Sequence, residues 1–505
     1  MPAKAFAIET IQQRRLADLQ HSGAGALILL TAVVITRIPA LFIPFFEDEV
    51  IYSAMASRIL AGFSPYLGAV DHKPPGIALL YAAIYWLVGR NRLFAVRIVL
   101  LISVWLTALV IRRIAAQLES SPRTAFLCAL CYILASAAGS PFDTQAANTE
   151  LFAAPVIATA VWCVLIGGRP RLFMAGASIA IATLLRYPSA LVGPALALVV
   201  LTDWRSDKKS LPRLLAAELS LAAGFAFIAA VFLAIMSHLH AVEALLFWGW
   251  KYNCTYLTTL TKGEMAKNAL LNTLRVGVRW IPLLLLFRRP ANGRSRVVIG
   301  AWLFATVCGL IPGGRFFEHY YLTLLPPLCL ALDFSRITRP ILTLAAVSST
   351  IAFVVQLVPY SIPSRVRHDN AVERDVARAV MRRTKPEERV FVWGASPGIY
   401  HYADRVMATR FSFCNYHTGR IWGSRYVDVN ADGSAYIEPR AWTELMEDLE
   451  AAPPVLIIDA AAGHLNRFDR DTIGRQPQLA RFVAAHYTLV ETVDGVPIYG
   501  RKSAS

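Results

Sequence analysis

Long apolar segments recur through the first 360 residues, and they constrain the fold more than any other feature of the chain. They lie at 23–46, 94–111, 124–140, 151–167, 173–185, 188–202, 214–236, 269–287, 297–311, 320–335 and 340–359. A helix that crosses a bilayer needs about 20 predominantly apolar residues, and its backbone amides and carbonyls must pair within the helix because lipid offers them no partner. The sequence therefore predicts a mainly α, polytopic membrane protein with about 11–13 transmembrane helices.

Charge divides the chain near residue 360. Residues 1–360 hold 31 Lys and Arg against 16 Asp and Glu, whereas residues 361–505 hold 19 against 18. About a quarter of the second part is charged, as in an average soluble domain. We therefore expect a transmembrane domain over 1–360 and a soluble domain over 361–505. Strand-like runs at 389–392 and 455–458, a helical pattern at 442–451 and a hairpin pattern at 487–499 predict that this second domain is α/β.

The basic residues also predict an orientation. Cytoplasmic loops of membrane proteins are enriched in Lys and Arg, and placing the N-terminus in the cytoplasm puts the basic clusters at 112–123, 169–171, 205–213, 288–296 and 336–339 on that side. The segments 47–93, 141–150, 237–268 and 312–319 and the soluble domain then lie outside. We expect a multi-pass protein of the inner (cytoplasmic) membrane whose basic charge belongs to its loops and not to nucleic-acid binding.

The first external loop breaks the spanning pattern. Apolar residues at Ile51, Met55 and Ile59 predict an amphipathic helix of about three turns that lies in the outer interface. Pro74-Pro75-Gly76 then interrupts the chain. A second short apolar helix follows at 77–88, where Tyr81, Tyr85 and Trp86 are expected as interfacial aromatic residues.

Three adjacent carboxylates, Glu47, Asp48 and Glu49, stand where the first apolar segment leaves the membrane. Their mutual repulsion and partial desolvation cost free energy, so they form either a solvated acidic cap or part of a site. Asp48 and Tyr52 are four residues apart and share a helix face. A carboxylate there can serve as a general base if a cavity opens beside it.

Asp71-His72-Lys73 forms a second polar cluster, directly before the rigid Pro74-Pro75. A lysine held at the membrane surface can bind a lipid-borne phosphate. The alternative is an ordinary interfacial lysine that extends its charge toward water.

Three further clusters lie at the outer ends of predicted spans, where charged groups are costly unless they are paired or functional. They comprise Asp143, Asn148 and Glu150; Arg186 and Tyr187; and Arg315, Glu318, His319 and Tyr320. An Arg315–Glu318 ion pair is the alternative for the last cluster. Under the predicted orientation all five clusters face the same side, which favours a common site.

The first loop, FEDEVIYSAMASRILAGFSPYLGAVDHKPPG, resembles that of the polyprenyl-phosphate-sugar glycosyltransferases of the GT-C fold. This group includes the protein O-mannosyltransferases and the bacterial aminoarabinose transferases of lipid A. The shared features are an Asp-Glu pair after the first span, an A-G-x-x-P-Y segment and a Lys-Pro-Pro. The segment from Arg315 to Pro327 resembles a late loop of the same group, and FVWGASPGIY, which ends at Tyr400, resembles the tail domain of bacterial members.

The resemblance implies a mechanism and assigns roles. A sugar on a polyprenyl phosphate in the outer leaflet is attacked by an acceptor hydroxyl with inversion, and the lipid phosphate leaves. Asp48 matches the proposed base, Glu49 is expected to assist it, and Lys73 matches the position beside the lipid phosphate. The remaining residues expected to contact substrate or lipid phosphate are Tyr52, His72, Asp143, Glu150, Arg186, Tyr187, Arg315, His319 and Tyr320.

The same resemblance implies the substrates. The chain lacks the large inserted domain of the protein O-mannosyltransferases, so a lipid or glycan acceptor in the cell envelope, such as lipopolysaccharide, is expected rather than a protein. The enzyme would be a hexosyl- or pentosyltransferase that works within membrane lipid. No cofactor or metal is expected, although dependence on a divalent cation stays open.

Two other classes of protein remain possible at this point. A secondary transporter or flippase for a lipid-linked or small polar substrate would show broken spans at matching positions in two halves, and the sequence has no such internal symmetry. A non-catalytic membrane scaffold would leave the outward-facing Asp48, Lys73, Arg186 and Arg315 unexplained.

Overall fold

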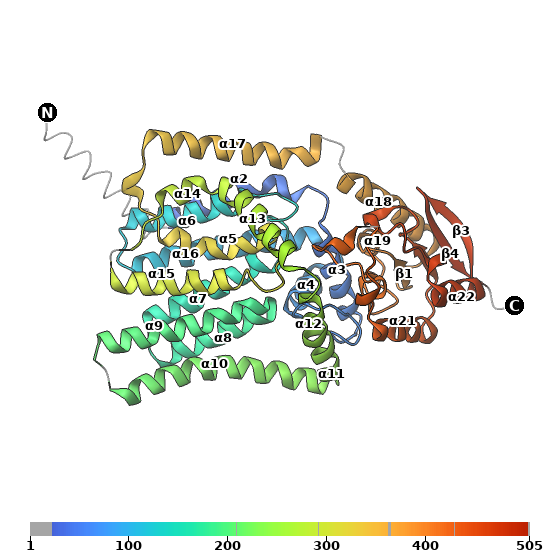
Figure 1. The fold of residues 1–505 in the computed structure, drawn as a ribbon, viewed down its shortest axis with the longest axis horizontal. Helices are drawn as coiled ribbons and strands as arrows, with labels where there is room; N and C mark the ends of the chain where they lie inside the picture. Colours follow the sequence, from blue (N-terminus) through green and yellow to red (C-terminus); the bar gives the residue numbers. More distant parts are fainter. Residues whose placement is uncertain (1–22, 209, 291, 362–364, 429, 503–505) are drawn as a thin grey trace.

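The computed structural model describes residues 23–208, 210–290, 292–361, 365–428 and 430–502. The N-terminal segment that the charge pattern places in the cytoplasm lies outside these residues. A bundle of long helices makes up most of the chain, and a smaller unit of strands and helices is seated at one end of it (Figure 1). Helices α3 (Glu47–Leu60), α4 (Gly76–Val88) and α12 (Tyr252–Leu257) lie between the bundle and this unit.

Every predicted apolar segment contains a helix. The helices of these segments are α2 (Gly23–Leu41), α5 (Leu93–Gln117), α6 (Pro122–Ser136), α7 (Thr149–Ile166), α8 (Arg169–Leu185), α9 (Val192–Ser206), α10 (Leu211–His238), α13 (Lys262–Arg279), α14 (Ile281–Leu286), α15 (Gly293–Cys308), α16 (Leu325–Leu330) and α17 (Arg339–Ser361). Within the described residues, five helical stretches are long and apolar enough to cross a membrane, at Gly23–Leu41, Leu93–Gln117, Thr149–Ile166, Tyr187–Ser206 and Leu211–His238. A polytopic helical protein is thus confirmed, and the full number of crossings stays a prediction.

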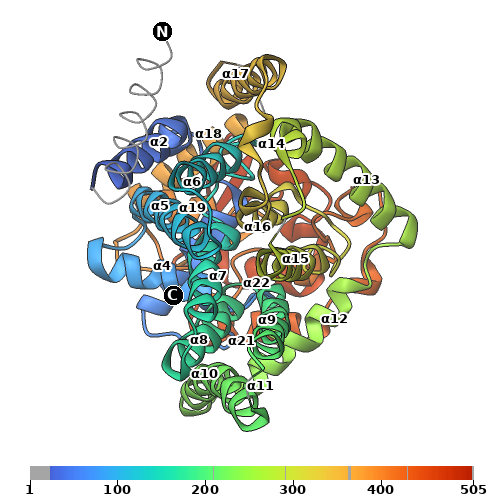
Figure 2. The same ribbon diagram turned by 90° about the vertical axis from the view of Figure 1, so that its left-hand side faces the viewer.

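The long helices pack in series, α5 on α7, α7 on α8 and α8 on α10. The closest of these contacts depends on two glycines: a Cβ on Gly176 of α8 would lie 1.8 Å from the carbonyl oxygen of Leu221, and one on Gly224 of α10 would lie 1.9 Å from that of Phe173. Small residues of this kind let membrane helices approach backbone to backbone. Viewed along the bundle, α17 lies at the periphery near α2 and α14 (Figure 2).

The loop after the first predicted span forms α3 (Glu47–Leu60) and α4 (Gly76–Val88), two short helices in the places that the sequence predicted. Every residue of α3 from Glu49 to Arg58 is buried, because the C-terminal unit covers the helix through α19 (Gly398–Ala403). The polar residues of α3 find partners in α4 and the segment after it instead of water: Ser53 bonds the hydroxyl of Tyr85 at 2.7 Å, and Ser57 donates to Asn91 at 2.7 Å.

The three aromatic residues of α4 that were expected at the interface differ in exposure. Tyr81 and Tyr85 are buried against α3 and the loop before α7, where Tyr81 donates to the carbonyl of Ala147 at 2.7 Å. Trp86 is exposed over 76% of its surface, as an interfacial residue should be.

The C-terminal unit is α/β, as its composition predicted. Its described strands form one sheet in the order β1-β2-β4-β3, with β1 (Val390–Trp393) parallel to β2 (Leu456–Asp459) and the other neighbours antiparallel. Strands β3 (Tyr487–Val493) and β4 (Val496–Arg501) form the predicted hairpin, which turns at Asp494-Gly495. The helices of this unit are α18 (Arg365–Arg383), α19, α20 (Asn415–Thr418), α21 (Pro439–Ala451) and α22 (Pro477–His486).

Short helices make up several connections. They are η1 (Tyr187–Leu191), α11 (Val242–Ala244), the π-helix η2 (Leu245–Lys251), α12 (Tyr252–Leu257), η3 (Glu318–Leu324), η4 (Phe334–Arg336), η5 (Arg425–Val427), η6 (Ser434–Tyr436), η7 (Leu465–Arg467) and η8 (Ile473–Arg475). The π-helix, α12 and η3 lie at the end of the bundle that meets the C-terminal unit.

Candidate active site

An ion pair between Asp48 and Lys73 joins the two clusters that the sequence singled out in the first loop. Asp48 lies in the first turn of α3, and Lys73 lies at the end of the loop that leads to α4. The Lys73 Nζ is 2.8 Å from Oδ1 of Asp48 and 4.9 Å from the centre of the Tyr52 ring. Asp48 and Tyr52 thus share a helix face, as their spacing predicted. The two charged side chains keep 22% and 30% of their surface exposed, so a substrate can reach both.

Glu49 differs from its neighbour because its carboxylate is buried and fully paired. It accepts two bonds from the Arg97 guanidinium, at 2.8 and 2.6 Å, and further bonds from the backbone amides of Phe46 and Ala147. The expected catalytic role of Glu49 has no support in this arrangement. The buried pair instead fastens the start of α3 to α5, which carries Arg97.

Asp71 belongs to the Asp71-His72-Lys73 cluster of the sequence, but it was not among the residues expected to contact substrate. It is 3% exposed, it accepts a bond from the backbone amide of His72 at 2.7 Å, and its second oxygen lies 3.9 Å from Nζ of Lys73. Burial by itself would raise the pKa of Asp71, but the charges of Lys73 and His72 and the bonds from His72 hold that pKa well below its usual range. Lys73 therefore lies between two carboxylates, those of Asp48 and Asp71. The signal in the sequence that could have indicated the role of Asp71 is its position two residues before Lys73.

The loop backbone at this point is held from the bundle side. The side chain of Asn253, in α12, donates to the carbonyl of His72 at 2.7 Å, and the Tyr66 hydroxyl donates to the carbonyl of Lys73 at 3.0 Å. A Cβ on Gly249 of the π-helix would lie 2.9 Å from the Tyr187 hydroxyl and 3.1 Å from that of Tyr66. The Tyr187 hydroxyl bonds to that of Tyr66, which in turn holds the Lys73 carbonyl.

The three other predicted clusters pair with one another across the helices. Arg186, after α8, binds Glu150, in the first turn of α7, at 2.9 Å and lies over the Tyr320 ring at 5.2 Å. His319 contacts Asp143 through Nδ1. The expected alternative, an Arg315–Glu318 pair, is replaced by a contact of Glu318 with Arg279.

His319 is a cation at neutral pH. Its burial would lower its pKa, but Asp143, Glu150 and Asp48 act together to raise that pKa to about 9. These three carboxylates come from α3, from α7 and from the loop between α6 and α7. Because all of them act on one imidazole, the predicted clusters lie close together at one end of the bundle.

Arg315, which was expected to bind a phosphate, is buried and bonded to other parts of the protein. It is 1% exposed, and its guanidinium donates to the carbonyls of Trp422, Gly313 and Tyr256 and to the hydroxyl of Thr259. A guanidinium has five N–H donors, and four are used here. Arg315 therefore links the bundle to the C-terminal unit, and a phosphate would have to displace these bonds.

His72 reaches this link through a stack of rings. Its imidazole lies 4.4 Å from the Tyr256 ring, and the Arg315 guanidinium covers the same ring at 3.5 Å. His72 thus packs among aromatic groups beside Asp71, and it does not contact Asp48.

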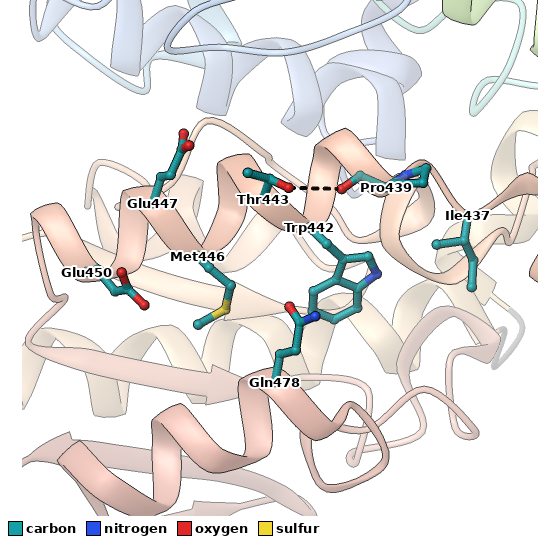
Figure 3. Close-up of a pocket in the computed structure, with 8 residues that line it drawn as sticks. All are labelled: Ile437, Pro439, Trp442, Thr443, Met446, Glu447, Glu450 and Gln478. Atoms are coloured by element: carbon teal, nitrogen blue, oxygen red, sulfur yellow. Dashed lines mark hydrogen bonds between the residues drawn. The ribbon is translucent and has the colours of Figure 1, made fainter.

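Within the described residues, no group of three or more His, Cys, Asp or Glu side chains is arranged to hold a metal ion. A surface groove of about 570 Å³ lies on the C-terminal unit between α21 and the start of α22 (Figure 3). It is lined by Ile437, Pro439, Trp442, Thr443, Met446, Glu447, Glu450 and Gln478. These residues are separate from the site residues above, so the groove is not part of the Asp48–Lys73 site.

Comparison with known proteins gives one family match and a whole-chain likeness. Residues 72–229 match the family model of the dolichyl-phosphate-mannose-protein mannosyltransferases. The structure of ArnT from Cupriavidus metallidurans bound to undecaprenyl phosphate is similar over 96% of this chain and 99% of that one, with 12% identity and a TM-score of 0.62. Its apo structure is similar over 95% and 98%, with 14% identity and a TM-score of 0.59. No curated protein sequence matches the chain.

The chain has the GT-C fold. The matched segment of the family model starts at His72 and includes Lys73, Asp143, Glu150 and Arg186, while Asp48 precedes it. The likeness of the GT-C fold extends over nearly the whole chain, so it includes the C-terminal α/β unit as well as the bundle. The resemblance seen in the sequence is thereby confirmed at the level of the fold.

Proposed function

We propose that this protein is a membrane glycosyltransferase that moves a sugar from a polyprenyl phosphate to a hydroxyl group of a lipid or glycan. The observation that carries the proposal is the Asp48–Lys73 pair, which sets a carboxylate and an ammonium group 2.8 Å apart, both accessible, at one end of a GT-C bundle. One structure with a similar fold holds undecaprenyl phosphate, which supports a lipid carrier of this class.

The reaction needs one proton acceptor and one group that stabilises the leaving phosphate. Asp48 takes the proton of the acceptor hydroxyl. At the same time, the oxygen of that hydroxyl forms a bond to the anomeric carbon of the sugar. The bond between that carbon and the phosphate oxygen breaks, and the polyprenyl phosphate leaves with the electron pair. Attack from the face opposite the leaving group inverts the anomeric carbon.

Lys73 is suited to the second task because its ammonium group already bridges Asp48 and Asp71. An incoming phosphate can share this cation with Asp48, and the charge that develops on the phosphate as the bond breaks is then offset. His319, cationic below a pH of about 9, adds positive charge to the same end of the bundle.

The test is direct transfer by purified full-length protein. It is incubated with a panel of polyprenyl phosphates that carry different hexoses and pentoses, together with lipid A and other envelope glycans, and release of polyprenyl phosphate is measured. Release that depends on one sugar and one acceptor supports the proposal and names both, and the anomeric configuration of the product reports inversion. Absence of release with every donor, by protein that remains folded, would reject the activity.

The proposal places the reaction at the outer face of the inner membrane, with the C-terminal unit outside the cytoplasm. The Lys and Arg distribution supports this orientation, and Figure 1 has the C-terminal unit at the same end of the bundle as α3 and α4. A reporter active only in the cytoplasm and fused after Ser505 should stay silent. A strong signal would reverse the orientation.

A further inference from the structure

The loop that carries Lys73 is held by the C-terminal unit as well as by the bundle. The backbone amide of Val70 donates to the carbonyl of Arg410 at 2.9 Å, and the hydroxyl of Tyr416 donates to Oδ1 of Asp71 at 3.4 Å. Arg410 and Tyr416 both belong to the C-terminal unit, and Tyr416 lies in α20. Two successive loop residues are thus fixed by a part of the chain about 340 residues further on.

The Tyr416 ring has little freedom to move. Its side chain is fully buried, and it packs edge-on against Tyr252 of α12 at 4.9 Å and Trp248 of the π-helix at 5.2 Å. Phe413 of its own unit lies 5.6 Å away. The hydroxyl is therefore presented to Asp71 from a rigid aromatic cluster that spans both parts of the chain.

Asp71, held in this way, in turn positions Lys73. Its Oδ1 accepts from Tyr416 and from the backbone amide of His72, which orients the carboxylate so that Oδ2 lies 3.9 Å from the Lys73 Nζ. A lysine ammonium is a point charge on a flexible stem of four carbons, and ordering such a side chain costs entropy. Two fixed carboxylates, Asp71 and Asp48, define one position for it.

We infer that Tyr416 is a positioning residue for Lys73, acting through Asp71, so that the C-terminal unit completes the site that receives the lipid phosphate. This inference rests on the proposed function, because it takes Lys73 as the phosphate-binding cation. It gives the C-terminal unit a part in substrate binding, although the unit need not touch the substrate.

The test compares the affinity of full-length variants for undecaprenyl phosphate in detergent micelles. Tyr416→Phe removes one hydroxyl and keeps the ring, and we expect its affinity to fall about 3- to 10-fold, as for the loss of a single hydrogen bond. Tyr487→Phe is the matched control: its hydroxyl is also buried in the C-terminal unit and bonded, at 2.7 Å to the carbonyl of Pro454. A purely structural role would lower the melting temperature of both variants and leave both affinities unchanged.

A double-mutant cycle provides the second measurement. Asp71→Asn should weaken binding by itself, and adding Tyr416→Phe to it should cause little further loss, because the hydroxyl acts through that carboxylate. The inference would be overturned if Tyr416→Phe bound the lipid as tightly as the wild type, or if the two losses of affinity were fully additive in the double variant. Sugar transfer by the wild-type protein would still support the proposed function in that case. If Tyr416→Phe does not fold, an unchanged affinity of Asp71→Asn overturns it equally. If the wild-type protein neither binds undecaprenyl phosphate nor transfers sugar, both proposals fail.

Discussion

Asp48 and Glu49 are adjacent carboxylates with opposite surroundings. Asp48 keeps 22% of its side chain exposed and has one lysine as its partner, whereas Glu49 is completely buried and is paired with Arg97 and two backbone amides. Successive helix residues point about 100° apart, so one of the two faces the site and the other faces α5. Both side chains end in a carboxylate, so the direction in which each one leaves the helix decides which of them a substrate can reach.

The first prediction concerns Asp48. Asp48→Asn keeps the size of the side chain and removes its ability to take a proton, so we expect a folded protein that still binds undecaprenyl phosphate but transfers sugar at least ~100-fold more slowly. Purified variants assayed with a defined donor provide the measurement. Glu49→Gln is the control, and its expected defect is a lower melting temperature, because Arg97 would lose its buried partner. Near-normal turnover by Asp48→Asn would remove Asp48 from the mechanism.

The second prediction separates Lys73 from Arg315, two cations for which the sequence suggested the same role. Lys73→Ala should weaken binding of the lipid phosphate ~10–150-fold, which corresponds to roughly 1.5–3 kcal/mol for a bond to a charged group. Arg315→Ala should mainly reduce stability, by about 2–4 kcal/mol, because it removes a buried network between the bundle and Trp422. Lipid titrations and thermal unfolding measure the two effects. Equal losses of affinity with unchanged stability would restore the phosphate role of Arg315.

At the scale of elements, the start of α4 meets the end of α8 without space for a side chain. A Cβ on Gly76 would lie 2.3 Å from the backbone carbonyl oxygen of Leu184. Gly76 follows Lys73-Pro74-Pro75, and Leu184 precedes Arg186 by two residues, so this contact sets the distance between the Asp48–Lys73 pair and the Glu150–Arg186 pair.

The third prediction follows from that contact. Gly76→Ala must push the first turn of α4 away from α8, so we expect a lower melting temperature and a lower rate of transfer even in the folded fraction. Gly300→Ala, in α15, is the control, since a Cβ there meets nothing within 4 Å and alanine favours a helix over glycine. Thermal unfolding and single-turnover transfer are measured for both variants. Wild-type behaviour of Gly76→Ala would show that the two helices can separate without cost.

At the scale of the whole molecule, three carboxylates meet where the C-terminal unit covers the start of α3. Burial raises the pKa of Glu47 to about 8, and Asp48 and Asp369 add to the increase. Burial likewise raises the pKa of Glu373, on α18, to about 8, with Glu47 and Asp369 adding and Arg374 opposing. Both carboxyls are therefore protonated at neutral pH in the folded protein.

The fourth prediction is the pH dependence that results. Because the pKa of each carboxyl is higher in the folded state than its ordinary value of 4.5, the stability each contributes is fully present below about pH 4.5 and is lost as the pH rises through about 8. A Glu47→Gln, Glu373→Gln double variant mimics the protonated forms. We expect its melting temperature to exceed that of the wild type by more at pH 8.5 than at pH 5. Parallel curves for the two proteins would contradict the prediction.

Regular patterns in the sequence were enough to predict most of the elements. The apolar segments predicted the helices of the bundle, and short runs of apolar residues with an Asp-Gly turn predicted β1, β2 and the β3–β4 hairpin. Such patterns are local, because the period of an element and the medium around it are recorded in consecutive residues. A common site for Asp48 and Lys73 was also expected, but their ion pair was not, because the sequence does not show how the loop between them folds.

Tertiary structure alone decided which of these residues remain available for chemistry. Glu49 is neutralised by Arg97, 48 residues away, Arg315 is held by the carbonyl of Trp422, 107 residues away, and Asp71 meets Tyr416 across 345 residues. The burial of α3 has the same origin, since the cover is supplied by α19. A hydrophobic period in the sequence shows that one face of an element will be covered. It does not show which side chains will cover that face, because they come from elements that are remote in sequence.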